Sequence, residues 1–292
     1  EPVEQALLSA ALQRQGATRV VVGHTPTSTR RVQQRFATGA ILADTGMLKP
    51  YYGGQASLVF IDGEALSVQY PALGPTRAAP DPVPVFDRSH AAIEALFANA
   101  PLPDSGTAEP FAIDSVRAVF EPGKAKANNA KVAAYRLSRL LGWDLVPVTV
   151  DRGNGVLVAL PNQSLTEAQR ITANAGRPNH CAIGSTYQLM YAFDALIQNE
   201  QRNAETMVYD QDSWRLCLVG HDAAFGRGRG VPGYLAAQPK ELPGAVIDQL
   251  GKLTAQGLTA ALGELLSEAQ IKALLKRRDN LIRNWKALSL TP

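Results

Sequence analysis

The stretch FDALIQNEQRNAETMVYD, from Phe193 to Asp210, is the part of the chain on which its interpretation depends. It begins as the end of an apolar helix, continues as a polar loop and ends in a segment typical of a strand. The helix starts upstream, in STYQLMYAFDALI, and its composition predicts that it is buried. Downstream, TMVYDQDSWRLCLVG predicts a hairpin that turns at residues 211–213. The polar loop therefore lies between a buried helix and a hairpin.

The segments before this stretch predict a smaller mixed α/β region. IDSVRAVFEPG, residues 113–123, predicts a strand, and NNAKVAAYRLSRLLGW, residues 128–143, predicts an amphipathic helix that stops at Gly142. Residues 145–160 predict two strands around a Gly-Asn-Gly turn, and the tail from Leu242 to Leu288 predicts two or three helices. The expected buried stripe of the amphipathic helix is Val132, Tyr135, Leu137, Leu140 and Leu141.

Together these segments resemble the bacterial kinase-like domain of the atypical kinase superfamily, which includes lipid kinases, secretory-pathway kinases and toxin kinases. The resemblance spans residues 112 to about 285 and implies a two-lobed domain with a helical tail. In these relatives the loop reads like FDxLIxNxDRNxGNxLxD, and the next strand reads like WRLxLIDHxxAF. The loop Asp positions the attacking hydroxyl, and the last loop Asn and the strand Asp hold magnesium. A strand Lys paired with a helix Glu orients the phosphate.

The chain matches this pattern at some positions and departs from it at those that carry the chemistry. Gln201 stands at the position of the loop Asp, Thr206 at that of the metal-binding Asn and Gly220 at that of the strand Asp. Glutamine accepts a hydrogen bond but takes no proton at neutral pH, and glycine offers no metal ligand. The residues that match are Asn199, Arg202 and Asn203.

The strand–helix ion pair of the family is expected to be reversed in sign. Glu121 stands at the strand Lys position and Lys131 at the helix acid position, so this pair presents the wrong charge to a nucleotide phosphate. Lys124 is a further candidate phosphate contact. Magnesium requires hard anionic oxygens, so we expect no ordinary site for magnesium and ATP. The expectation is a kinase-shaped domain without phosphoryl transfer.

Relocated acidic residues leave an active alternative open. Asp222, two residues beyond Gly220, is then the candidate metal ligand, and Glu200 or Glu205 is placed to replace the loop carboxylate. In that alternative the domain still binds ATP with magnesium or transfers phosphate. A third reading is a non-catalytic interaction protein with a protein partner.

A different set of motifs occupies the amino-terminal part. VVVGHTP predicts a buried strand, Val20–Val22, that delivers His24 to a loop; GAILADTGM and ASLVFIDGEALSVQY predict further strands, with a hairpin turn at Asp62-Gly63. In this order the motifs resemble the carboxyl end of a calcineurin-like metallophosphoesterase. These enzymes use two metal ions to activate a bridging water against a phosphate ester. The resemblance makes His24 a metal ligand and places Asp44 in a segment that flanks the site.

The other metal ligands of that family come from DxH, GD and GNH motifs, which this sequence lacks. Because one histidine cannot hold two metals and the chain starts at Glu1, we expect a fragment whose longer parent hydrolyses a phosphorylated substrate. The expected fold class is α/β (α+β). It comprises a metallophosphoesterase β-sandwich segment at residues 1–72, a proline-rich linker with a short helix at 73–108 and the kinase-like domain at 109–292.

Composition excludes several other classes of protein. The 292 residues are 46% hydrophobic, enough for a core, and the net charge of +3 is not massed in one run, so nucleic acid is not an expected partner. No segment approaches the roughly 20 apolar residues that span a bilayer, and no membrane partner is expected. Cys181 and Cys217 have no metal-ligand spacing and indicate free thiols in a reducing compartment, so the expected location is cytoplasmic.

Overall fold

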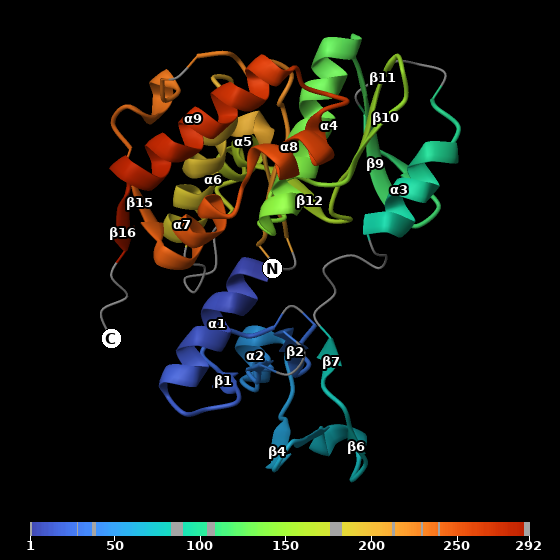
Figure 1. The fold of residues 1–292 in the computed structure, drawn as a ribbon. Coiled ribbons are helices and arrows are strands. Elements are labelled where there is room, and N and C mark those ends of the chain that lie inside the picture. Colours follow the sequence, from blue (N-terminus) through green and yellow to red (C-terminus); the bar gives the residue numbers. More distant parts are fainter. Residues whose placement is uncertain are drawn as a thin grey trace. The chain divides into compact units, whose positions relative to one another are not determined.

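The computed structural model describes residues 2–27, 29–36, 39–82, 90–103, 109–175, 183–211, 214–228, 230–238 and 240–288. The chain divides into two compact units (Figure 1). Unit 1 comprises Glu1–Asp87 together with Pro178–His180, and unit 2 comprises Arg88–Arg177 together with Cys181–Pro292. The division falls inside the stretch that the sequence predicts as a linker.

Unit 1 contains two small sheets. The first has the strand order β1-β3-β2-β7, in which β1 and β3 are parallel, and the second has the order β4-β5-β6. Ile41 of the first sheet and Val68 of the second pack with Val32, just before β2, and Tyr70, just after β5, and the Tyr70 hydroxyl accepts a hydrogen bond from the Val32 amide. The elements are α1 Pro2–Arg14, β1 Val20–Val22, β2 Gln33–Arg35, β3 Ala40–Leu42, α2 Lys49–Tyr52, β4 Leu58–Asp62, β5 Ala65–Gln69, η2 Pro71–Leu73, β6 Arg77–Ala78 and β7 Asp81–Pro82.

Two expectations for unit 1 need correction. The strand β1 forms where it was predicted, but it lies at the edge of its sheet, and Val21 and Val22 are 49% and 41% exposed rather than buried. The proline-rich stretch from Pro71 contains a 3-10 turn and two short strands instead of an irregular linker. Proline is tolerated at a helix start and in edge strands, because neither position requires its missing amide proton. The hairpin between β4 and β5 is confirmed.

The smaller lobe of unit 2 is a four-stranded antiparallel sheet covered by a helix (Figure 1). Its strand order is β10-β11-β9-β8, so the chain leaves β9, forms α4 and returns through β10 to place β11 beside β9. The helix α4 packs on β10 and β11. The elements are α3 His90–Asn99, β8 Phe111–Ile113, β9 Val116–Pro122, α4 Ala125–Leu141, β10 Thr149–Asp151 and β11 Gly155–Ala159.

The helix α4 ends as predicted at Gly142, which has a φ of 67° and donates its amide to Arg139 and Ser138 carbonyls. Glycine reaches this left-handed conformation without the strain that a Cβ adds. Val132, Leu137 and other predicted stripe residues are buried, but Leu140 is exposed. Leu140 lies one position from Leu141, about 100° around the helix, so the two residues cannot both face the sheet.

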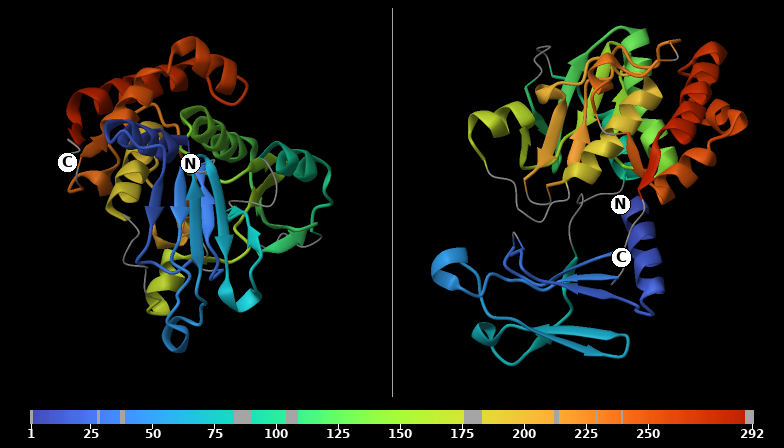
Figure 2. Two further views of the ribbon diagram at one scale, coloured as in Figure 1. Left: turned by 90° about the horizontal axis from the view of Figure 1, so that it is seen from below. Right: turned by 90° about the vertical axis from the view of Figure 1, so that its left-hand side faces the viewer.

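The larger lobe of unit 2 contains the stretch on which the interpretation depends. The predicted helix is α6, and the predicted hairpin is β13 with β14, extended by β12 into a three-stranded sheet. The helix α9 packs along α6, and both also appear side by side in Figures 1 and 2. The elements are β12 Ser164–Thr166, α5 Glu167–Thr172, α6 Ile183–Ile197, η3 Ala204–Thr206, β13 Met207–Asp210, β14 Leu216–Leu218, η4 Gly233–Leu235, β15 Glu241–Pro243, α7 Gly244–Gly251, α8 Ala255–Leu262, α9 Glu268–Asn284 and β16 Lys286–Leu288.

Unit 2 therefore has the layout that the sequence resemblance implies. A sheet and helix that share an ion pair precede a buried helix, a polar loop and a hairpin, and helices close the chain. We describe this layout as kinase-like. None of the helices in the described part of the chain combines the length and the hydropathy of a membrane span. Cys217 is a buried free thiol, and Cys181 lies outside the described residues.

Candidate functional site

The loop after α6 is held by a fully buried carboxylate, Asp194. Its two oxygens accept hydrogen bonds from Arg202 Nε at 2.8 Å and Arg202 Nη2 at 2.9 Å, in the two-pronged geometry that favours Arg–carboxylate pairs. The Asn199 side-chain amide donates to the same carboxylate, and so does the hydroxyl of Tyr234 at 2.5 Å. A carboxylate with this many donors fixes the path of the loop.

Arg202 also ties the loop to the hairpin that follows it. Its Nη1 donates to the carbonyl oxygens of Thr206 and Val219, both at 2.7 Å. Its Nη2 lies 3.1 Å from Nε2 of His221, which is fully buried. Burial lowers the pKa of His221 well below its ordinary value, and the positive charges of Arg202 and Lys131 lower it further. The imidazole is therefore neutral and accepts a hydrogen bond from the guanidinium.

The rest of the loop is a tight turn that uses its own polar groups. The Asn203 side-chain oxygen accepts hydrogen bonds from the amides of Glu205 and Thr206, and the Thr206 hydroxyl accepts one from the Asn203 amide. This reciprocal arrangement is a capping box. The side chains of Asn203 and Thr206 are thus engaged in hydrogen bonds within the turn, and neither is available as a metal ligand.

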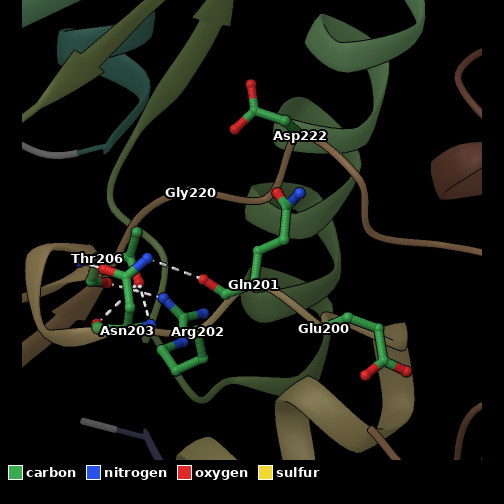
Figure 3. Close-up of a pocket in the computed structure, with 7 residues that line it drawn as sticks. All are labelled: Glu200, Gln201, Arg202, Asn203, Thr206, Gly220 and Asp222. Atoms are coloured by element: carbon green, nitrogen blue, oxygen red, sulfur yellow. Dashed lines mark hydrogen bonds between the residues drawn. The ribbon is translucent and has the colours of Figure 1, made fainter. Parts of the chain in front are cut away.

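A cavity of about 500 Å³ lies over this loop (Figure 3). In the view of Figure 3 the side chain of Gln201 extends toward Asp222, while that of Glu200 extends away from both. Glu200 instead accepts a hydrogen bond from the amide of Gly233. The lining residues are Glu200, Gln201, Arg202, Asn203, Thr206, Gly220 and Asp222.

The two positions at which the kinase pattern has metal ligands touch one another. Gly220 adopts a φ of 73°, and a Cβ built on it would lie 2.4 Å from Cγ2 of Thr206. The methyl group of Thr206 therefore fills the space that a side chain at position 220 would need. Neither residue offers an anionic oxygen. These residues do not fit a magnesium site, and no group of three or more His, Cys, Asp and Glu side chains in the described part of the chain is placed to hold a metal ion.

The predicted reversed ion pair is present, and Asp222 joins it. The Lys131 ammonium, on α4, lies 2.7 Å from Oε2 of Glu121, on β9, and 2.8 Å from Oδ1 of Asp222, which follows β14. Burial alone would lower the pKa of Lys131, but the charge of Glu121 and the hydrogen bonds that the ammonium donates to both carboxylates outweigh it and raise that pKa. Lys124 is the exposed N-cap residue of α4 and takes no part in this cluster.

Little space remains between the lobes beside Lys131. The cavity there measures about 10 Å³ and is lined by Glu121, Lys131 and residues in or next to β10, β11 and β14. That volume holds at most one water molecule. The arrangement of the two lobes in this structure therefore has no room for a nucleobase at that point.

The amino-terminal motifs meet at one edge of the unit 1 sheet. The parallel strands β1 and β3 place their carboxyl ends together, and the loops that carry His24 and Asp44 follow these ends. The amide of Thr27 donates to the Asp44 carbonyl, and the Asp44 carboxylate accepts from the Gly46 amide. His24 is exposed with a φ of 72°. The structure thus brings the GHTP and DTG loops together.

Sequence reasoning missed Asp194, Tyr234 and His221. A signal for Asp194 was present, because a carboxylate inside the apolar run YAFDALI must be paired if the helix is buried. Its partner Arg202 was noted only as a match to a pattern. No local signal points to Tyr234, since its contact with Asp194 spans 40 residues.

Comparisons with known proteins give structural similarities but no sequence family. No protein-family model and no curated protein matches the chain. Among solved structures, a hydra Fam20 protein with sugar is 16% identical, with a TM-score of 0.41, over 59% of this chain and 80% of that one. The Helicobacter pylori proinflammatory kinase CtkA is 8% identical, with a TM-score of 0.42, over 63% and 92% of the two chains. Because both TM-scores lie below 0.5, the kinase-like layout rests on the topology and residues described above.

Proposed function

We propose that unit 2 is a kinase-like domain that does not transfer phosphate and that serves a regulatory or binding role. The observation that carries this proposal is the contact between Thr206 and Gly220. In the family pattern these two positions supply the magnesium ligands, and here a methyl group occupies the space that a side chain at position 220 requires. A single substitution at either position does not restore the ligand set.

The position of the attacking group supports the same proposal. Phosphoryl transfer depends on positioning the nucleophile and neutralising the charge of the phosphates. Gln201 stands where a carboxylate would position and deprotonate a hydroxyl, and an amide takes no proton at neutral pH. The lysine of the cluster between the lobes, Lys131, is already paired with two carboxylates. Gln201 and Lys131 thus offer neither a base nor an unpaired positive charge for the phosphates.

Titration calorimetry with ATP, with and without magnesium, tests this proposal on the whole chain. We expect no magnesium-dependent binding and no incorporation of labelled phosphate into the chain or a generic protein substrate. The alternative with relocated carboxylates has an observation in its favour, because Asp222 and Glu200 both line the cavity. Magnesium-dependent ATP binding that Asp222→Asn abolishes would establish that alternative. Glu264→Gln, which removes an exposed carboxylate outside the cavity, is the matched control.

For unit 1 we propose the carboxyl-terminal part of a metal-dependent phosphoesterase that acts, in a longer parent protein, on a phosphorylated substrate. The adjacency of the loops that carry His24 and Asp44, at the carboxyl ends of two parallel strands, supports this proposal. Ligand sites of sheets with parallel strands commonly lie at such ends. One histidine does not make a two-metal site, so the remaining ligands would come from the parent.

The reading frame upstream of Glu1 provides the test for unit 1. We expect it to encode DxH, GD and GNH motifs, and we expect the longer protein to hydrolyse an aryl phosphate in the presence of Mn²⁺. His24→Ala in that protein should reduce the hydrolysis, whereas His90→Ala, in unit 2, should not. An upstream sequence without these motifs would favour the third reading, a non-catalytic interaction protein.

A further inference from the structure

The proposed absence of phosphoryl transfer in unit 2 does not explain why Lys131 lies between Glu121 and Asp222. Only 7% of the Lys131 side chain is exposed, and burying a charged group is costly unless partners compensate it. Two partners do so, because Nζ lies 2.7 Å from Glu121 and 2.8 Å from Asp222. These carboxylates come from the sheet of the smaller lobe and from the segment after β14 in the larger lobe. One cation therefore joins two acids from different lobes.

The same pair of carboxylates has the character of a divalent-cation site. Mg²⁺ and related ions bind through one or two protein carboxylates and keep several water ligands. Without a cation between them, two nearby carboxylates raise one another's proton affinity and repel. The side chain of Lys131 removes this repulsion with a single charge fixed to the protein, which leaves the three groups with a net charge of about −1.

We propose that the Lys131 ammonium is a tethered replacement for a divalent cation and that it masks a cation site formed by Glu121 and Asp222. This inference deepens the proposed function of unit 2: the domain keeps its two lobes bridged through the acids at the site without needing a metal. Loss of the lysine side chain uncovers the two carboxylates for Mn²⁺ or Mg²⁺.

The surroundings of Asp222 give an ion access to the uncovered site. Its side chain is 46% exposed and lines the cavity of about 500 Å³, so water can complete the coordination sphere. Glu121 is less exposed, at 23%. The small cavity that Lys131 itself lines, about 10 Å³, has room for no more than one water, so the ion would enter through the larger cavity beside Asp222.

Titration of the whole chain with MnCl2, in the absence of nucleotide, tests the proposal. The free Mn²⁺ concentration is followed by its paramagnetic resonance signal, and the melting temperature is measured in parallel. We expect Lys131→Met to bind one Mn²⁺ at least tenfold more tightly than the wild type and to melt at a higher temperature when Mn²⁺ is added. Lys131→Arg keeps the cation and should behave like the wild type. Lys131→Met with Asp222→Asn should lose the gain.

Two results would overturn the proposal. One is a Lys131→Met variant that binds Mn²⁺ no more tightly than the wild type, and the other is a gain in affinity that survives Asp222→Asn. If Lys131→Met is unfolded in chelator, Mn²⁺ should restore its circular dichroism, and a chain that stays unfolded with Mn²⁺ also contradicts the proposal. These titrations contain no ATP, so nucleotide binding by the wild type would contradict the proposed function and leave this result unchanged.

Discussion

Two ion pairs of unit 2 contain similar groups but differ in how completely they are buried. Asp194 and Arg202 have side chains that are 0% and 2% exposed, and their charges are satisfied by several further hydrogen bonds. The Lys131 cluster lies at the edge of a cavity, and its partner Asp222 is half exposed. A buried pair is a fixed part of the scaffold, because either charge alone would be left without compensation. A pair at a cavity edge can exchange its partner for water or an ion.

The loop residues that match the kinase-like pattern are ones that hold the loop in shape. Asn199, Arg202 and Asn203 match the pattern, and all three make hydrogen bonds that hold the loop together. Of the three departures, Thr206 still caps the turn, whereas the side chain of Gln201 extends toward Asp222 and Gly220 has no side chain. The loop therefore keeps its shape although the groups that would act on a substrate have changed. Shape and chemistry are separable in this site.

Removing the buried cation should have the largest effect. In Arg202→Met the carboxylate of Asp194 loses its ionic partner while it stays buried, which costs about 3–5 kcal/mol of the free energy of unfolding. Urea unfolding followed by circular dichroism measures this loss. Arg136→Met, at a half-exposed position of α4, is the matched control and should change the stability by less than about 1 kcal/mol. Equal losses in the two variants would remove the distinction between the buried and exposed pairs.

The hydrogen bond from Tyr234 to Asp194 is a second test of the buried pair, because it links this pair to the segment after β14. In Tyr234→Phe one hydrogen bond to a charged group is lost, and we expect a cost of about 1.5–3 kcal/mol. Tyr187→Phe is a fitting control, since its hydroxyl bonds to the neutral hydroxyl of Tyr209 at 2.7 Å. That bond should be worth about 0.5–1.5 kcal/mol. A larger loss for Tyr187→Phe would show that the charge of Asp194 adds little.

The sequence predicted local elements of unit 2 well, because their signals are local. The helix stop at Gly142 and the strands around residues 153–155 follow from glycine chemistry and from apolar patterning. Burial was harder to predict. Val21 and Leu140 are apolar residues in correctly predicted elements, yet both are exposed, since exposure depends on which elements lie opposite. Periodicity locates an element but does not identify its neighbours.

The site was predictable only in part for the same reason. The pattern located the loop and suggested the reversed pair of Glu121 and Lys131, which the structure contains as a salt bridge. It did not suggest that Asp222 completes this pair or that the methyl group of Thr206 fills the space beside Gly220. The contact of Lys131 with Asp222 joins segments that are far apart in the sequence. The contact of Thr206 with Gly220 depends on how the loop and the hairpin fold back on one another. Motif comparison assigns residues to positions, whereas packing decides what each position can do.

The smallest expected effect is a loss of folding stability at acid pH, which arises at His221, beside Arg202 and near Lys131. The pKa of His221 is lowered by burial and by Arg202 and Lys131, so the unfolded chain binds its proton at a higher pH than the folded chain does. Stability is therefore fully present above about pH 6.5 and falls as the pH drops below that value, by at most about 1.4 kcal/mol per pH unit.

Urea unfolding at pH 7.5, 6.5 and 5.5 measures how steeply the free energy of unfolding depends on pH, in a range where carboxylates stay ionised. His221→Gln should flatten this dependence, and His90→Gln, whose lowered pKa arises at a half-buried position, should flatten it less. If the wild type gains stability toward pH 5.5, the folded chain binds a proton at His221 more readily than the unfolded chain does. The surroundings of Arg202 and Asp194 would then accept a further positive charge, against what their burial indicates.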